Sequence, residues 1–225
     1  MNQPEPERDR LAEFASLYEP LREHAIMAHA NWQVWLALFS TGEERVDMLN
    51  RSASSFFAAV QSLFVHDTII SLARLTDPAG VEPRSNLTVE RLVGLLDDPA
   101  EASLRMNLEQ RLEAARDKLT DVRSIRNRRL AHLDLGTALG RRIELPSGPV
   151  VRDVTGALAD LKEILNTLER HFGSAVVMYD GYIHQSGPMT LLRRLRMAEA
   201  YERHVASGRI GKDEDDLRIP PLDDV

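Results

Sequence analysis

Hydrophobic residues recur every three or four positions along most of the chain, and glycine and proline gather in short clusters between these stretches. Such spacing is typical of α-helices, because every third or fourth residue of a helix lies on one face. No stretch alternates between apolar and polar residues as a half-buried strand would. The sequence therefore predicts an all-α fold. The expected helices cover residues 6–39 (with a possible interruption at Pro20), 43–49, 52–75, 88–96, 102–135, 153–179 and 189–204.

The most regular of these patterns is the one over residues 102–135. Its apolar stripe, in 4-4-3-4-3 spacing, consists of Leu104, Leu108, Leu112, Ala115, Leu119 and Val122. The same spacing leads next to Arg126 and Arg129, where core residues are due. An arginine in a helix seam is destabilising unless it is paired, and positions that break a pattern in this way are often functional. The alternative is that Arg126 lies at the end of the bundle and reaches solvent or a structural ion pair.

A second interruption lies in the helix predicted over residues 52–75. One stripe of this helix holds Phe56, Val60, Leu63 and Ile70. Asp67 falls between the last two members of the stripe. If the stripe faces the core, the buried carboxylate requires a cation, and Arg126 is the obvious candidate. If the helix is slightly rotated, Asp67 faces solvent instead.

The amino-acid composition excludes several kinds of catalytic and metal site. The chain has no cysteine, which excludes disulfides, thiol catalysis and cysteine-ligated metals. Its seven histidines form no i, i+4 pair, and none has a glutamate three residues before it. The helical zinc and di-iron patterns are therefore missing, and the sequence predicts no metal site and no cofactor.

Charge and hydropathy indicate where in the cell the protein is located and whether it binds nucleic acid or a membrane. The longest wholly apolar run has six residues, over 34–39, and the polar first residues do not resemble a secretory signal, so we expect a cytoplasmic protein without a membrane partner. A net charge of −7 argues against non-specific coating of nucleic acid and leaves room for a local basic site. We expect a single domain over 1–206 and a disordered acidic tail over 207–225.

The segment from Arg126 to His132, RNRRLAH, resembles the Arg-polar-x(3–5)-His signature of HEPN domains, with Asn127 as the polar residue. FFAAVQSLFVHDTIISLARLTDP, NLTVERLVGLL and IRNRRLAHLD together resemble the AbiU-like HEPN branch, which is associated with abortive infection in bacteria. The similarity spans about residues 10–200 in the order that the family shows. It implies an antiparallel helical bundle with additional helices.

The resemblance also implies a metal-independent endoribonuclease that works as a homodimer, with the motifs of both subunits at one cleft. In that chemistry the ribose 2′-hydroxyl attacks the neighbouring phosphate. His132 transfers a proton, Arg126 stabilises the charged phosphorane, and Asn127 positions one of them. Asp67 and Arg129 are expected to be auxiliary residues.

RNA is the expected substrate, because basic residues surround the motif in an otherwise acidic protein. These residues are Arg116, Lys118, Arg123, Arg128, Arg129, Arg141 and Arg142. We expect Arg123, Arg128, Arg141 and Arg142 to contact RNA, although acids nearby can also pair with part of this cluster. One straight helix places His132 about 120° from Arg126. Convergence then requires a bend or a second copy, which favours a homodimer.

Two other functions remain open at this stage. The first is a non-catalytic helical interaction module that binds a partner protein, such as an antitoxin or another defence component, or a nucleotide. The acidic tail suits partner binding. The second is a small-molecule site in the bundle core, built from Trp32, Trp35, His66 and Asp67.

Overall fold

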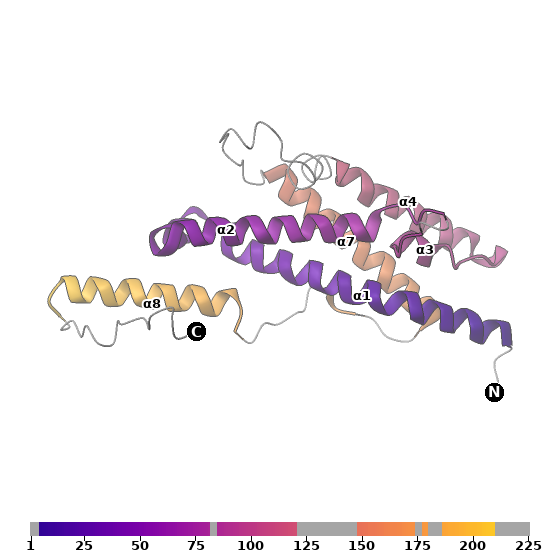
Figure 1. Ribbon diagram of the computed structural model, residues 1–225, viewed down its shortest axis with the longest axis horizontal. Helices are drawn as coiled ribbons and strands as arrows, with labels where there is room; N and C mark the ends of the chain where they lie inside the picture. The colour runs from indigo at the N-terminus through magenta and orange to yellow at the C-terminus, as the bar shows by residue number, and fades with distance from the viewer. Residues whose placement is uncertain (1–4, 82–84, 121–147, 174–176, 180–185, 210–225) are drawn as a thin grey trace.

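A computed structural model describes residues 5–81, 85–120, 148–173, 177–179 and 186–209 (Figure 1). All regular secondary structure in these residues is helical, without a strand, which confirms the all-α prediction. The elements are α1 (Glu5–Phe39), α2 (Glu43–Thr76), α3 (Val89–Val93), the 3-10 helix η1 (Pro99–Glu101), α4 (Ala102–Lys118), α7 (Gly148–Phe172) and α8 (Pro188–Ala206). Residues 210–225 of the predicted tail lie outside the described ranges.

The longest helices, α1 and α2, lie side by side along the molecule (Figure 1). A turn of three residues joins them and includes Gly42 with φ 122°, a conformation that glycine adopts without strain. α1 continues through Pro20, so the possible interruption there does not occur. Tyr18 and Leu21, on either side of the proline, are both buried in the core and hold the helix in place.

α2 joins the two helices predicted over 43–49 and 52–75. They meet at a kink at Ala53, which has φ −165° and ψ 75°. The core-facing side of α2 after the kink includes Val65, Ile69 and Leu72. The stripe that contains Phe56 and Leu63 lies on the opposite side, where these two side chains are 61% and 67% exposed.

The exposure of this stripe decides between the two alternatives that the sequence left open for α2, because Phe56, Leu63 and Asp67 face solvent and Val60 and Ile70 are only partly buried. α2 is apolar on two faces, and each face has the 3-4 spacing of a helix packed on a core. Periodicity alone therefore did not reveal which of the two faces is buried.

The main core is completed by α4 and α7, which pack against each other. The predicted α4 stripe is confirmed as far as it is described, since Leu108, Leu112, Ala115 and Leu119 are buried and Leu104 is partly buried. Its last member, Val122, lies outside the described residues. α4 ends at Lys118, so the predicted helix is broken at Leu119, and residues 121–135 of its predicted range lie outside the described residues. Leu119 leaves helical geometry at ψ 0°, and its N–H reaches the carbonyls of Ala115 and Arg116 in a tightened last turn.

α8 packs on a second, smaller core at the end of the α1–α2 pair (Figure 1). The buried members of this core are Leu38, Met48, Leu49, Phe57 and Leu192. Two ion pairs join α8 to α2: Arg51 to Glu199 at 2.8 Å and Arg196 to Glu44 at 2.7 Å. α8 is therefore attached to α1 and α2 through a contact separate from the main core.

Among the described helices, α2 alone is long and apolar enough to cross a membrane by length and composition. The expectation that no such segment exists considered only unbroken apolar runs. Core helices of soluble proteins meet the same criterion, and one face of α2 is packed against the main core. The kink at Ala53 also interrupts the helix within its length.

Candidate functional site

The predicted catalytic residues Arg126, Asn127 and His132 lie in the segment 121–147, outside the described residues. The same holds for the auxiliary and RNA-contacting positions in that segment, which are Arg129, Arg123, Arg128, Arg141 and Arg142. The structure does describe the helices that flank this segment, α4 before it and α7 after it. Their charged residues show which cations near the motif are already engaged.

Asp160 on α7 holds two cations from α4. Lys118 Nζ lies 2.5 Å from one carboxylate oxygen of Asp160, and Arg111 Nη1 lies 3.2 Å from the other. Gly156 makes the approach possible, because a Cβ atom there would lie only 3.1 Å from Cδ of Lys118. Lys118 therefore ties α4 to α7 and is not available as the RNA-binding cation that the sequence suggested.

Arg116 has a similar structural role at the C-terminal end of α2. Its Nε donates to the carbonyl oxygen of Thr76 at 2.8 Å, and its terminal nitrogens lie 3.2 Å from Glu90 and 3.4 Å from Glu113. An arginine at this place satisfies a carbonyl that the helix leaves without an internal partner. Arg116, like Lys118, is therefore a structural cation in the basic cluster around the motif.

Asp67 is exposed, as expected if the helix is rotated so that this residue faces solvent. The amide of Asn31, on α1, donates to Asp67 Oδ2 at 2.7 Å. An exposed carboxylate needs no buried cation, so the physical reason to pair Asp67 with Arg126 no longer applies. Its expected auxiliary role stays a prediction.

The two tryptophans of α1 belong to the main core. Trp32 and Trp35 are 2% and 3% exposed, and their rings are stacked with centroids 4.7 Å apart. Trp32 Nε1 donates to Thr155 Oγ1 on α7 at 2.9 Å. Buried tryptophans of this kind act in packing, and Asp67 lies on the surface. The residues named for a small-molecule site therefore do not form one binding surface.

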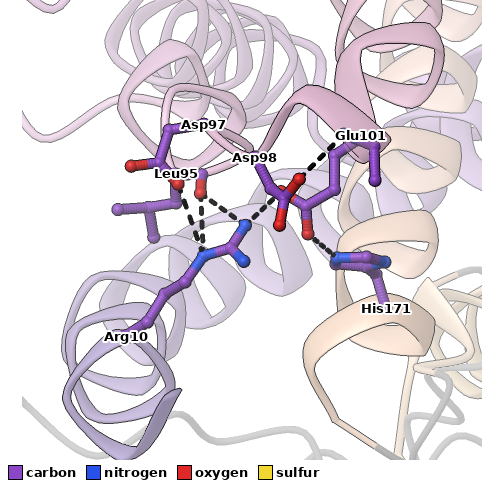
Figure 2. Close-up of polar contacts among 7 residues, drawn as sticks. Arg10, Leu95, Asp97, Asp98, Glu101 and His171 are labelled. Carbon is purple, nitrogen blue, oxygen red and sulfur yellow. Dashed lines mark hydrogen bonds and ion pairs between the residues drawn. The ribbon is translucent and has the colours of Figure 1, made fainter. Parts of the chain in front are cut away.

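A polar cluster, formed by Arg10, Glu101 and His171, joins three helices at the other end of the bundle (Figure 2). Arg10 on α1 donates to Glu101, the last residue of η1 and the N-cap of α4, and also to the carbonyl oxygen of Leu95 at 3.0 and 2.7 Å. His171 Nε2, near the end of α7, lies 2.5 Å from the second carboxylate oxygen of Glu101. The guanidinium of Arg10 also lies 5.0 Å from the ring centre of Phe172.

Sequence reasoning missed this cluster, because 91 residues separate Arg10 from Glu101 and 70 separate Glu101 from His171. No local spacing connects such positions. Burial raises the pKa of the Glu101 carboxyl, but the hydrogen bonds from Arg10 and His171 outweigh that effect, so the pKa is lowered overall. Every member of the cluster is engaged by another member, which indicates a structural tie.

We expect Glu101→Gln to lower the free energy of unfolding by about 1–3 kcal/mol at pH 7, because it removes a charged acceptor shared by two donors. A lowered pKa in the folded state stabilises the protein above the unfolded value near 4.5, and this contribution disappears as the pH falls through the folded pKa. Urea unfolding of both proteins at pH 7 and at pH 3 tests the expectation.

Glu109→Gln is the matched control for that comparison, since Glu109 is 52% exposed and pairs with Arg105 on the same helix. Surface pairs of this type contribute about 0.3–0.5 kcal/mol. Equal costs for the two variants, or a cost of Glu101→Gln that does not shrink at low pH, would contradict the role assigned to the cluster.

A second polar contact lies inside the main core. The hydroxyl oxygens of Tyr18 and Tyr179 are 3.5 Å apart, and burial raises the pKa of both phenols. Asn166 holds the segment before Tyr179 by donating to the carbonyl of Val177 and accepting from its N–H, at 3.2 and 3.0 Å. Both tyrosines stay protonated at neutral pH, so this pair acts in packing.

One surface pocket of about 290 Å3 lies between α1, the end of α2 and the loop that follows. Its lining combines apolar side chains such as Leu21 and Leu75 with the polar His24, Arg74 and Asn86. None of the residues predicted for catalysis or RNA contact lines this pocket. Among the described residues, no group of three or more His, Asp or Glu side chains is arranged to hold a metal ion.

Comparison with known proteins gives one result. The HEPN_AbiU2 family model, described as AbiU2, matches residues 11–187. The matched range contains the whole RNRRLAH segment and ends just before α8 begins at Pro188. No curated protein and no solved structure matches the chain.

Proposed function

Because the chain belongs to the HEPN_AbiU2 family, we propose that it is a metal-independent endoribonuclease of the HEPN type that acts in abortive infection or a toxin–antitoxin system. The observation that carries the proposal is the Arg126-Asn127-…-His132 signature inside the matched residues. Arginine and histidine are suited to this reaction, since one stabilises anionic charge on phosphorus and the other exchanges a proton near neutral pH.

In the proposed reaction the ribose 2′-oxygen forms a bond to phosphorus while the bond from phosphorus to the 5′-oxygen breaks. The 2′-hydroxyl gives up its proton, and the leaving 5′-oxygen takes one up. His132 transfers a proton in this exchange, Arg126 neutralises the charged phosphorane, and Asn127 orients one of the two by hydrogen bonding. The products are a 2′,3′-cyclic phosphate and a 5′-hydroxyl.

RNA binding is assigned to the arginines of the segment 121–147. The described ion pairs narrow this assignment, because Arg116 and Lys118 are held by acidic residues of the fold. Arg123, Arg128, Arg141 and Arg142 remain as the proposed phosphate contacts, with Arg129 beside the catalytic residues. The enzyme is proposed to act as a homodimer with two motifs at one cleft.

An interaction module without catalytic activity, which binds an antitoxin, another defence protein or a nucleotide, is the second candidate. The observation that favours it is the exposed apolar side of α2, where Phe56 and Leu63 are 61% and 67% exposed. Apolar surface of this kind often marks a protein interface. Such a surface is compatible with either function, so the decision requires an assay of cleavage.

The deciding experiment incubates the purified protein with EDTA and a single-stranded RNA, and in parallel with the same sequence made as DNA. We expect cleavage of the RNA alone, because DNA lacks the 2′-hydroxyl nucleophile. Mass spectrometry of the products is expected to show the cyclic phosphate end. Cleavage of the DNA, or loss of activity in EDTA, would contradict the mechanism. Intact RNA throughout would favour the interaction module.

A further inference from the structure

The solvent-facing side of α2 after the kink at Ala53 carries a continuous stripe. Its members, in 4-3-4-3-4 spacing, are Phe56, Val60, Leu63, Asp67, Ile70 and Arg74. Phe56 and Leu63 are the most exposed apolar members, at 61% and 67%, while Val60 and Ile70 are partly buried. This spacing equals the a/d pattern with which two helices pack against each other.

The stripe lies opposite the core. On a helix that turns about 100° per residue, the stripe members fall within about 40° of Phe56, whereas Val65 and Leu72 point to the other side. Ala59, which flanks the stripe, is exposed and small, which allows another helix to approach closely. Within the residues that the structure describes, the bundle therefore leaves the Phe56 and Leu63 side of α2 exposed.

The adjacent side of α1 widens this face. Asn31 of α1 is bonded to Asp67, and Met27, one turn before Asn31, is 53% exposed. The two helices together present about 30 Å along their axes and about 20 Å across, or roughly 600 Å2. A stable interface buries about 800 Å2 per partner, so the area is close to that of one half of a dimer.

We propose that this face binds a second copy of the chain, with the two α2 helices antiparallel and the two-fold axis near Leu63. The proposal identifies the surface through which the proposed homodimer forms. It rests on the proposed function only for the expectation that two copies pair. In this register Leu63 meets Leu63 of the second copy, and Phe56 meets Ile70. The contact is self-complementary, as a two-fold dimer requires.

Charge selects the antiparallel arrangement. Two parallel helices would place Asp67 opposite Asp67 and Arg74 opposite Arg74, and like charges at an interface are costly. In the antiparallel register Asp67 lies opposite Ala59 and Val60 and keeps its bond to Asn31. Arg74 lies opposite the exposed small residues 52–55, which leave room for its side chain.

The first test is the mass in solution, measured by sedimentation over a range of concentrations. We expect wild-type protein at twice the chain mass of 25.3 kDa and Leu63→Glu as a monomer, with the dissociation constant raised at least about 100-fold. Met106→Glu, a change at a residue of α4 that is 56% exposed, is expected to remain dimeric. Circular dichroism checks that both variants are folded, since neither side chain is buried.

The second test establishes the register, and the chain is suited to it because it contains no cysteine. We expect Leu63→Cys to form a disulfide-linked dimer under mild oxidation, because Leu63 faces itself across the axis. A mixture of Phe56→Cys and Ile70→Cys proteins is expected to give a crosslinked heterodimer. Phe56→Cys alone is expected to crosslink poorly, and efficient crosslinking of this variant by itself would overturn the antiparallel arrangement.

The remaining outcomes also decide the proposal. A monomeric wild type, or a dimer that Leu63→Glu leaves intact, would show that this face does not bind a second copy. Sedimentation with neutral lipid vesicles tests whether the apolar α2 contacts a membrane instead. A monomer that binds vesicles through Leu63 would overturn the proposal. RNA cleavage is measured separately, so an inactive dimer contradicts the nuclease assignment alone and an active monomer contradicts this interface.

Discussion

Replacement of His132 by alanine is expected to reduce RNA cleavage at least about 100-fold, the usual effect of removing a group that transfers a proton in the rate-limiting step. The substrate should still bind, because the proposed phosphate contacts come from arginines elsewhere in the segment. The prediction is checked by single-turnover cleavage with enzyme in excess, which reports the chemical step, together with RNA binding by fluorescence anisotropy.

The matched control is His204→Ala, since His204 is an exposed histidine near the end of α8 and lies outside the proposed site. Its cleavage rate is expected to equal that of the wild type. Arg126→Ala is expected to lose activity on the same scale as His132→Ala, because Arg126 is assigned the charge on the phosphorane. Full activity of His132→Ala would refute the assignment of the motif, whatever the outcome for Arg126.

Replacement of Trp32 by alanine is expected to lower the free energy of unfolding by about 3–5 kcal/mol, the range for truncation of a large aromatic side chain in a core. Trp32 is 2% exposed, stacks on Trp35, and donates a hydrogen bond to Thr155 of α7. The change thus removes packing and a link between α1 and α7. Chemical denaturation followed by circular dichroism measures the effect.

Two variants separate the contributions to that cost. Thr155→Val removes the acceptor of the indole N–H and is expected to cost about 1 kcal/mol. Met106→Ala, at an exposed position of α4, is expected to change stability little. A small effect of Trp32→Ala would contradict a packing role and would reopen the interpretation of the tryptophans as a ligand site.

Most of the fold followed from the period of the apolar residues. The stripe of α4 is buried as expected at Leu108 and Leu112, and α8 lies within two residues of its predicted position. The end of α4 was not predictable in this way, because Leu119 continues the apolar period and is itself buried although it lies after the helix. The apolar period marks side chains that can be buried, and it does not change where the backbone leaves helical geometry but the side chain stays buried, as at Leu119.

The candidate site was predictable only in part. The RNRRLAH segment is local, so a sequence motif was sufficient to identify it. The partners of the nearby cations are not local: Lys118 pairs with Asp160, which is 42 residues away, and Arg116 reaches Thr76 at a separation of 40 residues. Clustering of basic residues in the sequence therefore overestimated the positive charge available for RNA.

The small core under α8 is separate from the main core, so α8 can open locally while the main core stays folded. Phe57 belongs to the small core under α8, and its ring meets that of Phe56 edge-on, with centroids 5.3 Å apart. If α8 opens locally while the main core stays folded, Phe57 loses its cover beside the most N-terminal aromatic residue of the α2 stripe. Local opening of α8 would therefore extend the apolar surface of α2 by the ring of Phe57, next to Phe56.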